Sequence, residues 1–197
     1  NGGLAERMTE FARGGTGDRL TDANRFTDLE AAVGLAQFER WEHATEVRLR
    51  SAAVLDEVVP HLPGFSLQKV RPGDVNTYYL YGYKIDEKEA GVSSPDFAEA
   101  VRAEGIPDCY PPYVDSVPLY RYPIFAEGNT YGRSSYPFVD ELGNRRVDYG
   151  QVRLPNVASE LPKTGFILFR NSYTNEDPHD VAAAMRKVSS YFATRRR

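Results

Sequence analysis

The sequence has 197 residues, which suits one domain or slightly more and allows a real hydrophobic core. Its hydrophobic content of 41% and charged content of 26% are ordinary for a globular protein, and its net charge of -4 gives no basic field that would attract nucleic acid. Cys109 is the single cysteine, which favours a reducing compartment, and the longest apolar runs, such as residues 166–169, are too short to cross a bilayer. We therefore expect a cytoplasmic protein with no nucleic-acid or membrane partner.

The first expected elements are helical. Residues 4–11 have the pattern of a short amphipathic helix. Because this helix begins within three residues of the start and the sequence lacks an initiator methionine, we expect the chain to be a piece of a longer protein. A polar, glycine-rich loop follows, and then Thr27 and Glu30 stand three apart, as a capping box requires. Residues 27–59 continue as a long helical stretch that we expect to break near Arg40, where the apolar stripe changes phase.

The middle and the end of the chain alternate between strand and helix patterns. Residues 65–70, 76–86 and 166–170 are the strand candidates, and tyrosines alternate along the second of them. A serine cap before Pro95 begins a helix over 95–104, and a last helix covers about 178–192. This order predicts a small α+β domain, with helices packed on an antiparallel sheet.

Residues 106–154 form a long segment dense in proline, tyrosine and glycine, with little periodicity. A loop of this length is often functional. Its rigid Tyr110, Tyr113 and Tyr120 could wall a polar ligand of the size of a sugar. An aromatic coil packed on the sheet is the alternative. We expect Cys109 to be a strand residue near this coil rather than a nucleophile.

A self-contained active site is not evident in the sequence. The three histidines are scattered and lack metal-ligand spacing, and the five lysines have the context of solvated residues. Asn24 and Arg25 directly precede the N-terminus of the capped helix, where a guanidinium and free amides could contact an anion or a phosphate. An ordinary polar loop is the alternative for these two residues.

Four segments resemble the DegT/DnrJ/StrS-type aminotransferases, in the order of that family and over nearly the whole chain. They are LAERMTEFARGG, ANRFTDLEAAVGLAQFERWEHATEVRLRSAAVLDE, GVSSPDFAEAVRAEGIPDCYPPYVDSVPLYRYPIF and YTNEDPHDVAAAMRKV. The resemblance implies the C-terminal portion of a fold type I α/β enzyme that uses pyridoxal 5'-phosphate (PLP). Residues 1–40 would be the tail of the large PLP domain with an interface loop and helix, and residues 41–197 the small C-terminal α/β domain.

The resemblance also implies an activity. Family members move an amino group from glutamate or glutamine to a keto-sugar or keto-cyclitol, and the Pro-Leu-Tyr-Arg coil is most similar to the branch acting on cyclitols and 3-amino-5-hydroxybenzoate-type precursors. The family's Schiff-base lysine would lie upstream of Asn1, so the chain holds no catalytic residue and is expected to be inactive alone. A non-catalytic interaction module or remnant of a split gene, and a dehydratase variant with histidine in place of the lysine, are the alternatives.

The resemblance assigns the cofactor and substrate contacts of this chain. Arg25 matches the family arginine of a loop that crosses the dimer interface to the neighbour's cofactor phosphate. Asn24 takes the aromatic position of the motif, while the family's asparagine falls on Ala23, so the sequence departs there from the usual phosphate contact. Tyr110, Tyr113 and Tyr120 are the expected substrate contacts. The implied partners are the missing PLP domain, a second identical subunit and a small sugar or cyclitol.

Overall fold

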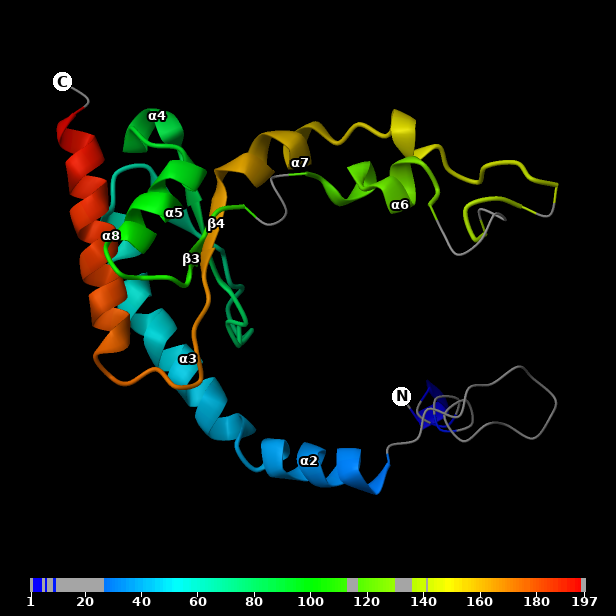
Figure 1. The fold of residues 1–197 in the computed structure, drawn as a ribbon, viewed down its shortest axis with the longest axis horizontal. Helices are drawn as coiled ribbons and strands as arrows, with labels where there is room; N and C mark the ends of the chain where they lie inside the picture. Colours follow the sequence, from blue (N-terminus) through cyan, green and yellow to red (C-terminus); the bar gives the residue numbers. More distant parts are fainter. Residues whose placement is uncertain are drawn as a thin grey trace. The chain divides into compact units, whose positions relative to one another are not determined.

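The computed structural model describes residues 2–4, 6, 9, 27–112, 117–129, 136–140 and 142–195. The chain divides into two compact units, Asn1–Thr45 and Glu46–Arg197. The helices are α2 (Asp28–Phe38), α3 (Trp41–Asp56), α4 (Glu87–Ala90), α5 (Ser94–Ala103), α6 (Pro123–Ala126), α7 (Pro155–Glu160) and α8 (Asp177–Thr194). The strands are β1 (Phe65–Leu67), β2 (Tyr81–Ile85), β3 (Cys109–Tyr110) and β4 (Thr164–Ile167), and Figure 1 follows them along the chain.

Helix α2 in the first unit begins with the expected capping box. The Thr27 hydroxyl accepts a hydrogen bond from the Glu30 amide at 3.2 Å, and the Glu30 carboxylate accepts one from the Thr27 amide at 2.8 Å. These bonds satisfy two amides that the helix itself leaves free. The helix ends at Phe38, and a turn at Glu39 and Arg40 separates it from α3, so the predicted break near Arg40 is confirmed. Residues 2–4, 6 and 9 are helical, in agreement with the helix predicted over 4–11.

The second unit is built on a four-stranded sheet in the order β1-β2-β4-β3, in which every neighbouring pair is antiparallel. The register places Phe65 opposite Ile85, and Ile167 opposite both Tyr81 and Cys109. Strand β3 at the edge is short, and its segment continues into the tyrosine- and proline-rich stretch. The expected antiparallel sheet with packed helices is confirmed.

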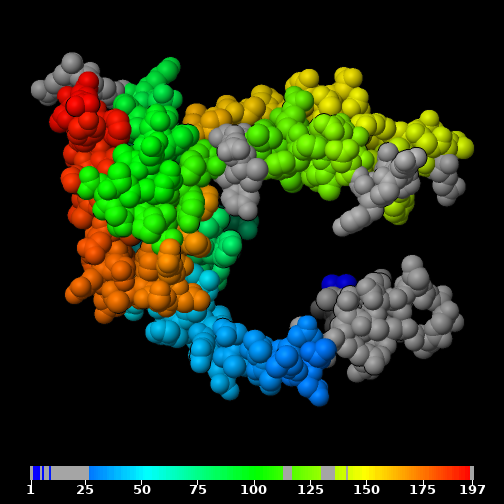
Figure 2. Space-filling view, in the orientation of Figure 1, coloured from blue at the N-terminus to red at the C-terminus, as the bar shows by residue number. Residues whose placement is uncertain are grey.

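The core lies between this sheet and helices α3, α5 and α8. Alternate residues of β2 are buried because successive side chains of a strand point to opposite faces. Phe97 of α5 is fully buried, and its ring centroid lies 4.8 Å from that of Phe65 and 6.1 Å from that of Tyr83. Figure 2 shows the side chains of α8, in orange and red, directly against those of α5, in green. The core also includes the buried residues Leu55, Tyr81, Ile85, Val101, Ile167, Val181 and Met185.

One close approach inside the sheet requires glycine. A Cβ atom at Gly165 of β4 would lie 2.6 Å from the ring of Tyr83 on the neighbouring strand. The absence of that atom lets the Tyr83 ring lie across β4, where its hydroxyl reaches the Cys109 sulfur at 3.4 Å. The Tyr83 ring is thereby fixed between β2 and β3.

Several predicted boundaries are wrong by a few residues. The strand predicted over 65–70 ends at Leu67, and the one over 76–86 is confined to Tyr81–Ile85, because Tyr78 has a φ of 47° that interrupts extended backbone. The strand predicted over 166–170 is instead Thr164–Ile167. Helix α3 ends at Asp56 and a 3-10 turn, η1 (Val59–His61), follows it, so the helical stretch does not reach residue 59 unbroken.

Residues 117–160, which we call the arm, contain only short elements. They are η3 (Leu119–Arg121), α6, η4 (Tyr149–Gln151) and α7, coloured green to orange-yellow in Figure 1. Among its described residues no hydrophobic side chain is buried. Instead the rings of Phe125, Phe138 and Tyr149 pack on one another, with centroids 5.4 to 6.0 Å apart.

Candidate functional site

The two residues expected to contact the cofactor phosphate, Asn24 and Arg25, lie outside the described residues. The helix that follows them is described, and its start is acidic. Asp28 and Glu30 occupy the first turn of α2, and hydrogen bonds from Thr27 lower the pKa of the Glu30 carboxyl. The capping box also occupies the amides of Thr27 and Glu30.

None of the chain's lysines lies in an environment that would make it a Schiff-base former. All five, at positions 69, 84, 88, 163 and 187, are described and exposed to solvent. Lys187 forms an ion pair with Glu104 at 2.5 Å.

Tyr110 belongs to β3, at the edge of the sheet. Its ring stacks on Phe166 of β4 with centroids 5.2 Å apart and an interplanar angle of 19°, and it is half-buried. The neighbouring Cys109 is a buried strand residue, as expected. Burial raises the pKa of the Cys109 thiol to about 11, so the thiol stays protonated at neutral pH and is a poor nucleophile.

Of the other two tyrosines expected to contact the substrate, the structure describes only Tyr120. Tyr113 lies outside the described residues. Tyr120 lies in η3 and is half-buried, and the guanidinium carbon of Arg121 lies 5.3 Å from the centroid of its ring. That distance is within the range of a cation–π contact. The described geometry does not place Tyr110 and Tyr120 in contact with each other.

An ion pair beside Tyr110, between a buried carboxylate and an exposed arginine, was missed from the sequence. The Asp108 carboxylate is buried and accepts two hydrogen bonds from Arg170, from Nε at 2.6 Å and from Nη2 at 2.8 Å. The Asp108 carbonyl oxygen also accepts from the Leu168 amide at 3.0 Å, and the Tyr173 hydroxyl lies 3.5 Å from the carboxylate. Burial, together with this carboxylate, raises the pKa of the Tyr173 hydroxyl to about 12. The pair ties the chain after β4 to the start of β3 and so fixes the edge on which Tyr110 lies.

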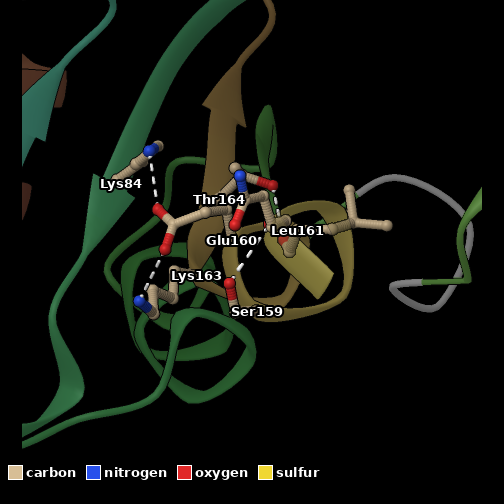
Figure 3. A network of polar contacts seen from close by, with 7 residues as sticks. Lys84, Ser159, Glu160, Leu161, Lys163 and Thr164 are labelled. Atoms are coloured by element: carbon tan, nitrogen blue, oxygen red, sulfur yellow. Dashed lines mark hydrogen bonds and ion pairs between the residues drawn. The ribbon is translucent and has the colours of Figure 1, made fainter. Parts of the chain in front are cut away.

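A second ionic contact, shown in Figure 3, joins the C-terminal end of the arm to the sheet. Lys84 of β2 donates to one carboxylate oxygen of Glu160 at 2.7 Å, and Lys163 donates to the other at 2.9 Å. These two ammonium groups lower the pKa of the Glu160 carboxyl to about 2. The contact joins α7 to β2, residues that are 76 apart in the sequence.

Arginines of the arm donate to main-chain carbonyl groups. Arg145 reaches the carbonyl oxygens of Ala126 at 3.3 Å and Glu127 at 2.7 Å, and Arg121 and Arg153 share that of Gly150. Such contacts leave no periodic signal in a sequence, because any sufficiently close carbonyl can accept them. The sequence alone could therefore have identified the arginines but not their partners.

The histidines and acidic side chains of the described residues form no metal centre. His43, His61 and His179 are exposed, as the sequence indicated. In the described part of the chain no three His, Cys, Asp or Glu side chains are placed to hold a metal ion. Over the same residues, no helix combines the length and the apolar content that spanning a membrane needs.

Solved structures with the same fold include aminotransferases. The chain superposes on DesV of S. venezuelae with a TM-score of 0.68 at 16% identity, covering 96% of this chain and 45% of that one. It superposes on Helicobacter pylori PseC, an aminotransferase involved in the biosynthesis of pseudoaminic acid, with a TM-score of 0.68 at 15% identity, covering 97% of this chain and 47% of that one. These matches confirm that the chain has the fold of part of a fold type I aminotransferase.

Sequence comparison points the same way. The spore coat polysaccharide biosynthesis protein SpsC of Bacillus subtilis (strain 168) is 23% identical over 161 residues, covering 82% of this chain and 36% of SpsC. The chain thus spans less than half the length of the relatives it matches. The model of the DegT/DnrJ/EryC1/StrS aminotransferase family matches residues 2–150, and the chain therefore belongs to that family.

Proposed function

We propose that this chain is part of a PLP-dependent aminotransferase that transfers an amino group from glutamate or glutamine to a keto-sugar or keto-cyclitol in the cytoplasm. The family match over residues 2–150 carries the proposal. The relatives named above support a sugar-like acceptor, since SpsC is a polysaccharide biosynthesis protein and PseC takes part in pseudoaminic acid biosynthesis. In this assignment residues 1–40 end the large PLP domain, and residues 41–197 are the small C-terminal domain.

The chain alone would be inactive. A PLP aminotransferase needs a lysine that can lose its proton close to the cofactor, and the lysines of this chain are exposed. Incubation of the purified chain with PLP, borohydride reduction and peptide mass mapping should find no single lysine that carries the cofactor stoichiometrically. Modification of one lysine in preference to the other four would contradict this part of the proposal.

The exposed apolar side chains of α2 support a partner surface. None of its residues is buried, and Leu29 and Phe38 are 76% and 69% exposed. Exposed apolar residues gathered on one helix are typical of an interface. We assign this surface to the missing PLP domain or to a second identical subunit, which would also bring the loop holding Asn24 and Arg25 to the neighbour's cofactor phosphate.

Arg25 provides the sharpest test in a full-length dimer. A charge-assisted hydrogen bond contributes roughly 1.5–3 kcal/mol, so Arg25→Ala should weaken PLP or substrate binding by about one to two powers of ten. Arg40→Ala, an equal loss of charge at the exposed turn after α2, is the matched control and should leave binding unchanged.

A mixed dimer separates a contact across the interface from one within the subunit. Pairing an Arg25→Ala subunit with a subunit that lacks the Schiff-base lysine should restore one active site, in which an intact lysine faces an intact Arg25. If Arg25→Ala leaves cofactor affinity and turnover unchanged, the loop is structural and the assignment of Asn24 and Arg25 is wrong.

The substrate assignment of Tyr110, Tyr113 and Tyr120 has its own test. Replacing each by phenylalanine in the full-length enzyme keeps the ring and removes one hydroxyl. A hydroxyl that holds the acceptor should raise KM for the keto substrate while leaving PLP affinity unchanged. Equal kinetic constants in all three variants would show that these tyrosines pack on the protein instead.

A further inference from the structure

Strand β3, which carries Tyr110, is the shortest of the four strands. It consists of Cys109 and Tyr110, which pair with Ile167 and Phe166 of β4. Successive side chains of a strand point to opposite faces, so Tyr110 points away from the core that encloses Cys109. A slip of one residue would exchange the faces of these two side chains. Because the ladder of β3 is so short, contacts outside it are needed to hold the register.

The Asp108–Arg170 pair is placed to supply such a contact. Asp108 directly precedes β3, and Arg170 lies shortly after the end of β4. The carboxylate accepts from Nε and Nη2 of one guanidinium at 2.6 and 2.8 Å, and this two-point geometry fixes direction as well as distance. A slip of one residue would move Asp108 by about 3.4 Å along the strand and turn its side chain to the other face. Both hydrogen bonds would then be lost.

The unequal burial of the pair makes this loss unfavourable. The Asp108 side chain is 5% exposed, whereas that of Arg170 is 57% exposed. A guanidinium at the surface can be hydrated when it loses its partner, but a buried carboxylate cannot, so it is strongly destabilising when left alone. The carboxylate therefore favours the one register in which it meets Arg170.

Two further contacts hold Cys109 itself. Arg102 of α5 donates from Nη1 to the Cys109 carbonyl oxygen at 2.8 Å, and the Tyr83 hydroxyl lies 3.4 Å from the Cys109 sulfur. Each of these is a single contact, and the sulfur is a weak hydrogen-bonding partner. The bidentate ion pair is therefore the contact whose removal should loosen β3 most.

We propose that Arg170 is a positioning residue for substrate binding: through Asp108 it holds β3 in register and so keeps the Tyr110 ring stacked on Phe166. The stack has centroids 5.2 Å apart and an interplanar angle of 19°. The contact of Tyr110 with the substrate rests on the proposed function, whereas the hold on the register does not. Arg170 acts through another residue and needs no contact with the substrate.

The single cysteine reports on the register, because Cys109 is fully buried while β3 is in place. We expect N-ethylmaleimide to label Cys109 of the native purified chain about tenfold faster in Arg170→Gln than in the wild type. Lys187→Gln, which breaks the exposed pair with Glu104, is the matched control and should be labelled at the wild-type rate. Equal labelling rates in all three proteins would overturn the proposal.

The dependence of labelling on urea separates opening of β3 from unfolding of the whole domain. Local opening exposes little surface, so labelling of Arg170→Gln should hardly respond to urea below the unfolding transition. A labelling rate that rises steeply from the lowest urea concentrations, with the slope of global unfolding, would show that the substitution only lowers overall stability. That result would overturn the register role of the pair.

Kinetics of the full-length enzyme test the link to the substrate. Arg170→Gln should raise KM for the keto substrate several-fold and leave kcat and PLP affinity unchanged. Arg170→Lys, which keeps the charge but not the fork, should recover part of the increase in KM and part of the protection of Cys109. A raised KM in Tyr110→Phe but not in Arg170→Gln would overturn the positioning role. Unchanged KM in both variants, together with faster labelling of Cys109, would overturn the substrate contact of Tyr110 while the register role stands.

Discussion

The sheet and the arm belong to the same unit but are stabilised in different ways. The sheet and its helices enclose buried side chains such as Phe97, Tyr83 and Met185, so burial of apolar surface dominates their stability. The described part of the arm buries no hydrophobic side chain. Its order rests on three packed rings and on arginines that donate to carbonyl groups, each of which contributes modestly.

The partners of the basic side chains also differ between the two regions. In the sheet region Arg170 pairs with Asp108 and Lys187 with Glu104. In the arm Arg121, Arg145 and Arg153 donate to neutral carbonyl groups. The contrast holds for these arginines and not for every charge, since Glu160 of the arm pairs with Lys84 and Lys163.

The largest effect is expected in the sheet core. Phe97→Ala should lower the free energy of unfolding by about 3–5 kcal/mol, because a fully buried ring is replaced by a cavity between α5 and β1. Urea denaturation followed by far-ultraviolet circular dichroism measures this change.

The same substitution in the arm sharpens the contrast. Phe138→Ala removes a ring that packs on Phe125 and Tyr149, so the near-ultraviolet signal should fall. The free energy of unfolding should change by less than about 0.5 kcal/mol, as for other substitutions outside a core. A loss of stability comparable with that of Phe97→Ala would mean that arm and sheet unfold as one cooperative body.

An intermediate effect is expected at the edge of the sheet. Arg170→Gln leaves the buried Asp108 carboxylate without its bidentate partner, so the melting temperature should fall. Lys187→Gln, the matched control, breaks the exposed pair with Glu104 and should change the melting temperature little. Equal shifts in the two variants would show that the Asp108–Arg170 pair stabilises the sheet no more than a surface pair does.

The smallest effect concerns the pH dependence of the contact between α7 and β2. The pKa of Glu160 is lowered from 4.5 to about 2 by Lys84 and Lys163, so the contact contributes stability above pH 4.5 and loses it as pH falls through about 2. Titration of the Glu160 side chain by NMR should give a midpoint near 2 in the wild type and a higher one in Lys84→Gln. A midpoint near 4.5 in both proteins would show that the ionic contact is absent in solution.

The sequence predicted best where local rules decide the structure. The Thr27–Glu30 capping box, the break at Arg40 and the strand position of Cys109 all follow from spacing or from immediate neighbours. The ends of β2 did not, because the positive φ of Tyr78 shortens a strand whose alternating pattern continues beyond it.

The candidate site was less accessible from the sequence. Its tyrosines could be named from composition, but the Asp108–Arg170 pair joins residues 62 apart. The contact of Arg121 with the Gly150 carbonyl likewise depends on the course of the arm backbone. Contacts between distant segments follow from tertiary structure, which no period in the sequence encodes. The family resemblance assigned roles to positions but gave no geometry for the arm.

Hydrogen–deuterium exchange of the chain tests the contrast between sheet and arm most directly. We predict that amides of β2 and β4 exchange slowly, because their opening requires unfolding of the core. Amides around η3 and η4, including those of Arg121 and Gln151, should exchange faster, because no hydrophobic side chain is buried in the described part of the arm. Equal exchange in sheet and arm would contradict the difference in stability proposed here.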